Sequence, residues 1–290
     1  MTEGPTSMPQ GPVLSAEAFQ ALRDLIRNAC GIVVPDNKET SLEGKLGEHV
    51  LRLGLPGFRE YVDLLERESY AGEVWQELFH RVSTGETYFF RNEAQNRVFA
   101  EHLLPTVIRR QQGRMFKRIK VWSAACATGE EAYTLAIQLH QALGRQAGEW
   151  IPMVTGTDID RTAIQVAERG EYGGRSLQQV PPRMLKKYFE PAGDRYLVTE
   201  TLRRMVFFKP VNFADEEEMA TQINMDVIFC RNVLIYFDGE FRKRVVDRLY
   251  NSLKPGGYLV IGHSESLRGV HDGFASIPFP GTHVYQRPEE

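Results

Sequence analysis

The later two-thirds of the chain alternates short apolar runs with helix-like segments. The apolar runs have the length and residue types of buried parallel strands; they are residues 118–123, 152–159, 225–232 and 258–263. The helix-like segments between them are residues 130–144, 161–169 and 240–253. Such alternation predicts an α/β fold with a doubly wound parallel sheet. Residues 282–287 are expected to close the sheet as a late, antiparallel strand.

The first part of the chain has a different pattern. Residues 1–14 are rich in Pro and Gly and are expected to form a disordered lead-in. Apolar residues then recur at helical spacing, which predicts a small all-helical domain over residues 15–84, with Ser15 as an N-cap. The expected helices are residues 15–28, 39–53, 57–69 and 71–83. The α/β domain follows over residues 85–290, and turn signals within it predict an inserted antiparallel β-subdomain at about 172–210.

Charge and cysteine content exclude several classes of function. The formal net charge is -3 and no basic run is present, which argues against nucleic-acid binding. No segment approaches the roughly 20 apolar residues that span a bilayer, so no membrane insertion is expected, and the N-terminus lacks the features of a signal peptide. The three cysteines are widely spaced without a CxxC pair. They predict reduced thiols in a cytoplasmic protein and no metal site.

Ligands of open α/β sheets bind beyond the carboxyl ends of the strands, so the residues there are the candidates for function. Small residues over 123–129 would let a ligand lie against the backbone, and Glu130 then opens a helix. Glu130 could contact the ligand or could cap the helix through its dipole. Asp158 ends the next strand, where a carboxylate can bind ribose hydroxyls, although Asp158 or Asp160 could instead cap helix 161–169. The combination favours ribose binding for Asp158 and capping for Asp160.

Two further strand ends carry polar side chains. Asn212 could bind an adenine edge and Phe213 could pack on the adenine face, or both could belong to a turn. Arg231 and Asn232 end another buried strand, with Tyr236 just beyond. Polar groups there are costly unless they bind a ligand or are well paired. The interpretation that all four ends share is a nucleoside pocket. Residues 215–218 are expected to be a solvated acidic loop.

At these positions the sequence resembles the CheR family of chemoreceptor glutamate methyltransferases, over about residues 15–286. The resemblance is densest in five blocks: STGETYFFRN (83–92), VWSAACATGEEAYTLAI (121–137), GTDID (156–160), FCRNVLIYFD (229–238) and LKPGGYLVIGHSESL (253–267). It implies an N-terminal helical domain, a class I methyltransferase domain and an inserted three-stranded β-subdomain. It also implies S-adenosylmethionine as cofactor, S-adenosylhomocysteine as product, and glutamate methyl esters on chemoreceptor cytoplasmic domains as the outcome.

The resemblance implies a set of cofactor-binding residues. They are Gly85, Thr87, Arg91, Glu130, Asp158, Asn212, Phe213, Arg231 and Asn232. Gly85 stands where some members have Asn, so a side-chain contact is lost there. Tyr236 matches a family position beside the methyl donor, and Arg91 and Tyr236 are the expected catalytic residues.

Two departures from the family concern partners. Members that bind a tethering peptide carry a Gly-rich loop in the β-subdomain, whereas the loop over residues 190–195 has one glycine. We therefore expect no C-terminal peptide tethering. The second N-terminal helix is often basic in the family, but here acidic residues are interleaved with its basic ones, which puts receptor docking through that face in doubt. The enzyme is expected to be a monomer.

The chemistry implied needs no general base. A glutamate has an ordinary pKa of about 4.3, so its carboxylate is ionised at neutral pH and can attack the methyl group directly. A bidentate clamp on that carboxylate would stabilise the ground state, so we expect Arg91 to hold the methionine carboxylate of the cofactor instead. Tyr236 would orient the substrate oxygen. His263, at a strand end, is interpreted as structural.

Two alternatives stay open at this point. One is a class I methyltransferase with another substrate, although the absence of a [DN]PP[YF] motif argues against DNA. The other is a non-catalytic module that binds S-adenosylmethionine or S-adenosylhomocysteine, against which the intact site residues argue.

Overall fold

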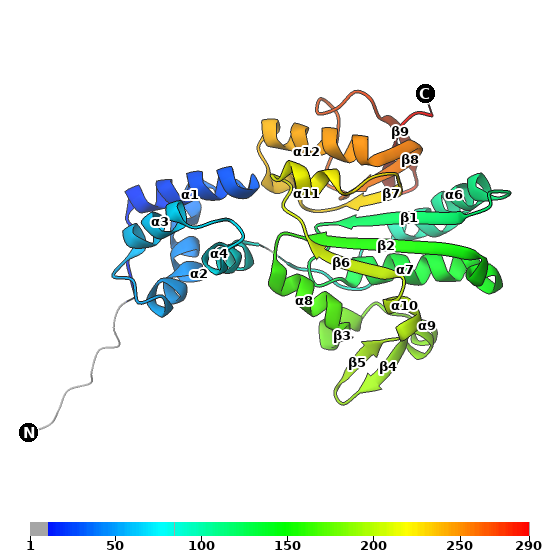
Figure 1. The fold of residues 1–290 in the computed structure, drawn as a ribbon, viewed down its shortest axis with the longest axis horizontal. Coiled ribbons are helices and arrows are strands. Elements are labelled where there is room, and N and C mark those ends of the chain that lie inside the picture. The colour runs from blue at the N-terminus through cyan, green and yellow to red at the C-terminus, as the bar shows by residue number, and fades with distance from the viewer. Residues whose placement is uncertain (1–10, 84, 290) are drawn as a thin grey trace, which may run out of the picture. The chain divides into compact units, whose positions relative to one another are not determined.

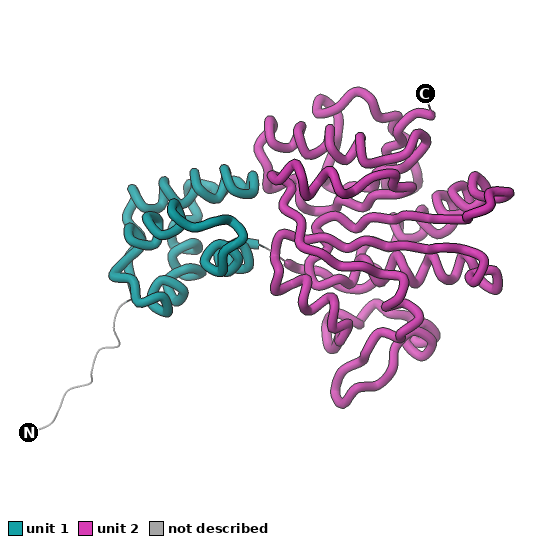
Figure 2. The backbone as a smooth tube through the Cα atoms, viewed as in Figure 1, with its two compact units in different colours: residues 1–84 teal, residues 85–290 magenta. Residues whose placement is uncertain are grey.

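The computed structural model describes residues 11–83 and 85–289. The chain divides into two units, residues 1–84 and 85–290 (Figure 2). Residues 1–10, most of the expected lead-in, lie outside the described residues, as does Thr84 at the expected domain boundary. Leu14, the last residue of that lead-in, is 2% exposed, and its backbone N–H donates to Glu43.

The first unit is all-helical, as predicted. Its helices are α1 (Ala16–Cys30), α2 (Glu39–Arg52), α3 (Phe58–Arg67) and α4 (Glu73–Val82). The Ser15 side chain accepts a hydrogen bond from the backbone N–H of Ala18, which confirms the predicted N-cap of α1. The apolar faces of these helices meet in a core that includes Leu22, Leu46 and Trp75, each at most 1% exposed.

A seven-stranded sheet forms the centre of the second unit (Figure 1). In spatial order the strands are β6 (Val206–Pro210), β2 (Trp150–Asp158), β1 (Lys117–Ala124), β7 (Met225–Cys230), β8 (Leu253–Ile261), β10 (Thr282–Gln286) and β9 (Ala275–Phe279). The pairs from β6 to β8 are parallel, and β10 is antiparallel to both its neighbours. The predicted doubly wound sheet with a late antiparallel strand is therefore confirmed.

Helices from the crossover connections cover this sheet. α7 (Glu130–Leu143) packs against β1, β2 and β6, α8 (Arg161–Arg169) against β2 and β6, and α12 (Gly239–Ser252) against β8. Most of α7 is buried all round, as expected for a helix enclosed by other elements. Before β1 the chain forms α5 (Glu93–Val98), a π-helical turn (Phe99–Leu103) and α6 (Leu104–Gln111). No described helix has the length and apolar character needed to cross a membrane.

A second, three-stranded antiparallel sheet lies between α8 and β6. It consists of β3 (Glu171–Tyr172), β5 (Arg195–Val198) and β4 (Phe189–Ala192), with α9 (Pro182–Tyr188) between β3 and β4 and α10 (Glu200–Arg203) after β5. The small sheet ends at residue 198, earlier than the expected limit near 210. Residues 206–210 pair instead with β2, because their apolar side chains complete the parallel edge of the main sheet.

Candidate functional site

The register of the main sheet brings the predicted site residues to one edge. Ala124 at the end of β1 pairs with Thr157 of β2 and with Cys230 of β7, and Cys230 pairs with Ile261 of β8. Asp158 pairs with Pro210, the last residue of β6. The polar residues that follow each of these strands therefore lie along a common carboxyl edge, as the parallel arrangement requires.

The small-residue loop after β1 has an unusual backbone. Ala125 and Ala127 have positive φ angles of 61° and 47°. Residues with a Cβ rarely adopt such angles, and they cluster at functional sites when the surroundings hold them there. Here the backbone N–H of Cys126 donates to Thr157, and that of Ala127 donates to the Asp158 carboxylate at 2.8 Å. Gly85 lies beside the loop, since a Cβ on it would be 3.8 Å from the Ala127 methyl group.

Asp158 is placed to receive hydrogen bonds at this edge. Its Oδ2 accepts from the Ala127 N–H and its Oδ1 from the Asp160 N–H at 3.0 Å. Burial raises the pKa of Asp158 to about 6, although the backbone hydrogen bonds oppose that rise. Each carboxylate oxygen keeps a lone pair for a further donor. The Asp160 side chain accepts from the N–H groups of Thr162 and Ala163, so the predicted cap of α8 is confirmed for Asp160.

Glu130, at the start of α7, is bonded to hydroxyl groups. It is 2% exposed, and its carboxylate accepts from Thr128 Oγ1 at 2.7 Å and from Ser176 Oγ at 2.5 Å. Ser176 belongs to the segment between β3 and α9. Glu130 therefore ties that segment to the small-residue loop, a contact that its position in the sequence did not reveal.

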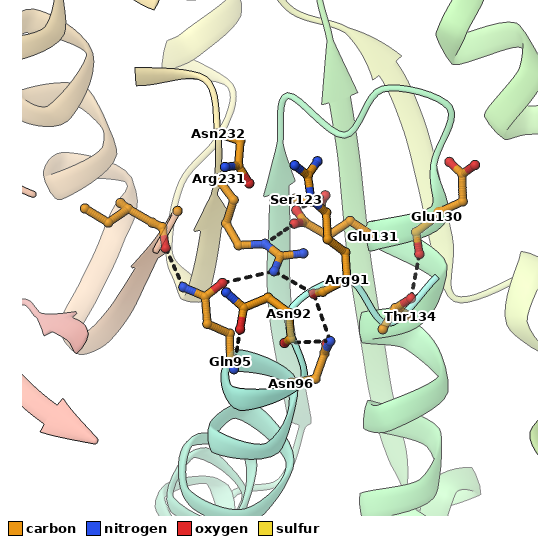
Figure 3. Close-up of polar contacts among 12 residues, drawn as sticks. Arg91, Asn92, Gln95, Asn96, Ser123, Glu130, Glu131, Thr134, Arg231 and Asn232 are labelled. Carbon is orange, nitrogen blue, oxygen red and sulfur yellow. Dashed lines mark hydrogen bonds and ion pairs between the residues drawn. The ribbon is translucent and has the colours of Figure 1, made fainter. Parts of the chain in front are cut away.

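Arg231 is the centre of a buried polar network (Figure 3). Its Nε lies 2.5 Å from Glu131 Oε2, and its Nη1 donates to Gln95 Oε1 at 3.0 Å. The side chains of Arg231 and Glu131 are 6% and 11% exposed. Ser123 Oγ donates to the other oxygen of Glu131 at 2.6 Å. A polar residue at a strand end was expected either to bind a ligand or to be paired with other protein groups. The Arg231 side chain is paired with protein groups.

The same network fixes the backbone of Arg91. The Arg91 carbonyl accepts from Arg231 Nη1 at 2.9 Å and from Asn96 Nδ2 at 3.0 Å. The flanking residues Phe90 and Asn92 have φ angles of 60° and 66°, so the segment is held in a strained path. The half-buried Arg91 side chain donates to the carbonyl of Glu86 at 2.6 Å. Four of the five guanidinium N–H groups are thus left to bind an anion.

Asn212 and Phe213 form a turn at the end of β6. Asn212 Oδ1 accepts from the Ala214 N–H at 2.9 Å, and its own N–H donates to Glu218. The Phe213 ring is 7% exposed and meets Phe237 edge to face at 6.1 Å. Residues 215–218 do not form the expected loop, because Asp215 caps a short helix, α11 (Glu216–Ala220).

Asn232 and Tyr236 flank the turn that follows β7. Asn232 has a φ angle of 59°, and Tyr236 ends the 3₁₀ turn Leu234–Tyr236. Tyr236 is half-buried, and its hydroxyl has no hydrogen-bond partner among the described residues, which leaves it available to a ligand. Thr87 is half-buried and Gly85 exposed. A hollow of about 750 Å³ adjoins this edge, lined by residues 261–263 and 265–269 and by the hairpin of β9 and β10. His263 is exposed in its wall, which does not fit the structural role expected for it.

Sequence reasoning missed Glu131, Gln95 and Glu265. Glu131 and Gln95 hold Arg231, and Glu265 accepts backbone N–H groups from the turn that carries Tyr236. Nothing in the sequence around Gln95 marks it as functional, since a polar residue on a short helix is ordinary. Glu265 does stand in the GHSES sequence directly after β8, at the strand edge where functional residues were sought.

The residues along this edge fit S-adenosylmethionine. Ala125 and Ala127 have no side chain beyond Cβ, so the loop can be approached closely, and Asp158 supplies the acceptor that a ribose needs. Arg91 offers a planar cation for a carboxylate group, and the backbone carbonyl of Glu86, rather than an acidic side chain, holds it. No group of three or more His, Cys, Asp or Glu residues in the described part of the chain could hold a metal ion.

Comparison with known proteins gives consistent matches over both units. Residues 17–83 match the family model described as "CheR methyltransferase, all-alpha domain", and residues 85–282 match "CheR methyltransferase, SAM binding domain". The chain is 34% identical to the chemotaxis protein methyltransferase of Escherichia coli, over 90% of this chain and 88% of that protein. It is 35% identical to that of Klebsiella aerogenes, over 92% and 89%, and 29% identical to Cher2 of Pseudomonas putida, over 92% and 97%. The chain therefore belongs to the CheR methyltransferase family and is an S-adenosylmethionine-dependent methyltransferase.

Proposed function

We propose that the enzyme methylates glutamate side chains on the cytoplasmic domains of methyl-accepting chemoreceptors, forming methyl esters for sensory adaptation. The observation that carries the proposal is that both units match the two domains of the CheR family in order. The curated relatives that it matches over most of their length are chemotaxis protein methyltransferases, which supports the same pathway.

The residues along the strand edge would share the binding of the cofactor. Asp158 accepts from the ribose hydroxyls, and Asn212 and Phe213 take the adenine, with Asn232, Thr87 and Gly85 nearby. Arg91 holds the methionine carboxylate. Arg231 and Glu130 act through their network contacts: Arg231 fixes the Arg91 carbonyl, and Glu130 anchors the small-residue loop.

A carboxylate is supported as the attacking group because it needs no general base. When bound, S-adenosylmethionine supplies a methyl group on a positively charged sulfonium. Burial raises the pKa of the Cys126 and Cys230 thiols well above their ordinary value, so neither is ready to act as a thiolate. A glutamate is already ionised at neutral pH, and its charge is cancelled as the new bond forms, which a site poor in water favours. The Tyr236 hydroxyl, unpartnered within the described chain, would orient the attacking oxygen.

The small sheet supports a docking mode without a tethering peptide. β4 and β5 are joined by the two residues Gly193 and Asp194, because Ala192 and Arg195 still pair as part of the ladder. The loop expected over residues 190–195 is therefore mostly strand, and the two-residue turn within it contains a single glycine. We propose that a monomer in the cytoplasm acts on receptors directly.

The proposal is tested by methyl transfer from radiolabelled S-adenosylmethionine to purified receptor cytoplasmic domains, with the base lability of the product as the second measurement. We expect base-labile label on receptors whose glutamates are intact and none where those glutamates are replaced by alanine. Removing the C-terminal peptide of a receptor should leave kcat/KM unchanged within about twofold. Base-stable label, or label that does not depend on receptor glutamates, would show that the enzyme modifies another substrate. Binding of S-adenosylhomocysteine without any transfer would identify a non-catalytic module.

A further inference from the structure

We propose that Glu265 is a positioning residue that holds Asn232 and the Tyr236 turn in their working geometry. This inference rests on the proposed role of Tyr236 in orienting the substrate oxygen. Glu265 follows β8, the strand that pairs with β7.

The Glu265 carboxylate accepts hydrogen bonds from three backbone N–H groups. Its Oε2 accepts from Gly262 at 2.6 Å and from Asn232 at 3.0 Å, and its Oε1 accepts from Ile235 at 3.3 Å. The Glu265 N–H donates back to the Gly262 carbonyl at 2.9 Å, which closes the turn. One side chain thus joins the ends of β8 and β7 to the turn that carries Tyr236.

These bonds offset strain in the segment after β7. Asn232 has a φ angle of 59°, a left-handed conformation that is uncommon for residues with a Cβ, although Asn adopts it more readily than most. Hydrogen bonds to a carboxylate are stronger than those between neutral groups. Among the described residues, Glu265 has no Lys, Arg or His in an ion pair with it, so its charge is directed at these N–H groups alone.

The glycine at position 262 is explained by the same arrangement. A Cβ on Gly262 would lie 2.6 Å from Glu265 Oε2 and 3.0 Å from the Asn232 nitrogen. Both separations are too short for a methyl group, and the φ of Gly262 does not itself demand glycine. Gly262 is therefore present so that the carboxylate and the Asn232 backbone can approach each other.

The decisive variant is Glu265→Gln, because an amide has one acceptor oxygen where the carboxylate has two. That oxygen can serve Gly262 and Asn232, which leaves the amide NH₂ facing the Ile235 N–H. We expect kcat for methyl transfer to fall by about 10-fold to 100-fold, as small misplacements of reacting groups do, with the KM for S-adenosylmethionine changed less than about threefold. Gly262→Ala displaces the carboxylate and also presses on the Asn232 nitrogen, so kcat should fall and the KM for S-adenosylmethionine should rise with it. The control is Glu240→Gln, an exposed glutamate on α12, which should match the wild type.

Amide hydrogen exchange provides a readout that does not depend on the substrate. Exchange in the segment 230–237 should be faster in Glu265→Gln and Gly262→Ala than in the wild type and Glu240→Gln. If the wild-type enzyme does not methylate receptors, the proposed function is wrong. Amide hydrogen exchange in residues 230–237 still tests whether Glu265 holds this segment. The positioning role is refuted if both variants keep wild-type kcat and wild-type exchange, or if kcat and cofactor affinity fall together with no local change in exchange.

Discussion

Arg231 and Glu131, 100 residues apart in the chain, form a buried ion pair with an Nε–Oε2 distance of 2.5 Å. Removing one partner of such a pair leaves the other charge buried without compensation. We expect Glu131→Ala to lower the free energy of unfolding by about 3–5 kcal/mol. Denaturant unfolding measures the loss. Glu240→Ala, whose exposed carboxylate lies 4.0 Å from Arg244, is the control and should change stability by less than about 0.5 kcal/mol. A loss for Glu131→Ala as small as the control's would mean that the buried pair does not hold the fold.

Arg91→Ala tests which carboxylate the guanidinium binds. If Arg91 holds the cofactor, the Kd for S-adenosylhomocysteine should rise by about 10-fold to 100-fold, since a charge-assisted hydrogen bond contributes about 1.5–3 kcal/mol. Titration calorimetry measures it, with Arg97→Ala on the exposed side of α5 as the control. Unchanged product affinity combined with slower turnover would assign Arg91 to the substrate instead.

Tyr236→Phe removes the hydroxyl and keeps the ring. We expect kcat for receptor methylation to fall about tenfold or more, because the attacking oxygen loses its orientation. Affinity for S-adenosylhomocysteine should stay as in the wild type, and Tyr70→Phe in the first unit serves as a control with wild-type kcat. Steady-state kinetics at saturating cofactor make the measurement. Wild-type kcat in Tyr236→Phe would remove the hydroxyl from the mechanism.

Cofactor affinity should depend on pH through Asp158. Burial raises the pKa of this carboxyl to about 6, so it becomes protonated as the pH falls through that value. The ionised form is the better acceptor for ribose hydroxyls, and affinity for S-adenosylhomocysteine should therefore weaken below about pH 6, by up to tenfold per pH unit.

The stability linkage of Asp158 has the opposite sign. Because its pKa is higher in the folded chain than in the unfolded chain, protonation of Asp158 favours folding as the pH falls below 6. At pH 5.5 the protonation of Asp158 therefore stabilises the folded chain. Weaker cofactor binding at that pH cannot be caused by unfolding through this residue. Calorimetry across pH 5–8 should give a flat profile of lower affinity for Asp158→Asn. An equally steep profile in that variant would place the titrating group elsewhere.

Gly129→Ala tests the packing behind the small-residue loop. A Cβ there would lie 2.6 Å from the Ala167 methyl group, at a φ of +94°. Strain and overpacking together should cost about 2–5 kcal/mol. Gly113→Ala, with a φ of +83° and open space around its Cβ, isolates the backbone strain and should cost less. The thermal midpoints of the two variants make the comparison. Equal losses would show that the close approach to Ala167 is not limiting.

The class of the sheet and the edge that carries the site follow from patterns that are local in the sequence. The apolar runs predicted β1, β2, β7 and β8, and the rule that ligands bind beyond parallel strands placed the candidates at one edge. The β9 strand was not predicted from the sequence. Residues 275–279 are exposed or half-buried, so they do not form an apolar run, and they include a proline. The roles of the site residues toward the cofactor stay predictions.

The sequence by itself determined the helix caps, because Ser15 and Asp160 bind N–H groups two or three residues ahead and so depend only on the local path of the chain. It also predicted strands β1, β2, β7, β8 and β10 of the main sheet, because hydrophobic periodicity is a property of each segment alone. Only the tertiary structure decided the partners of Arg231 and Glu265, since those lie on other elements and meet through the packing of the sheet. A polar residue at a strand end can bind a ligand or a neighbour, and the arrangement of the surrounding elements decides between them.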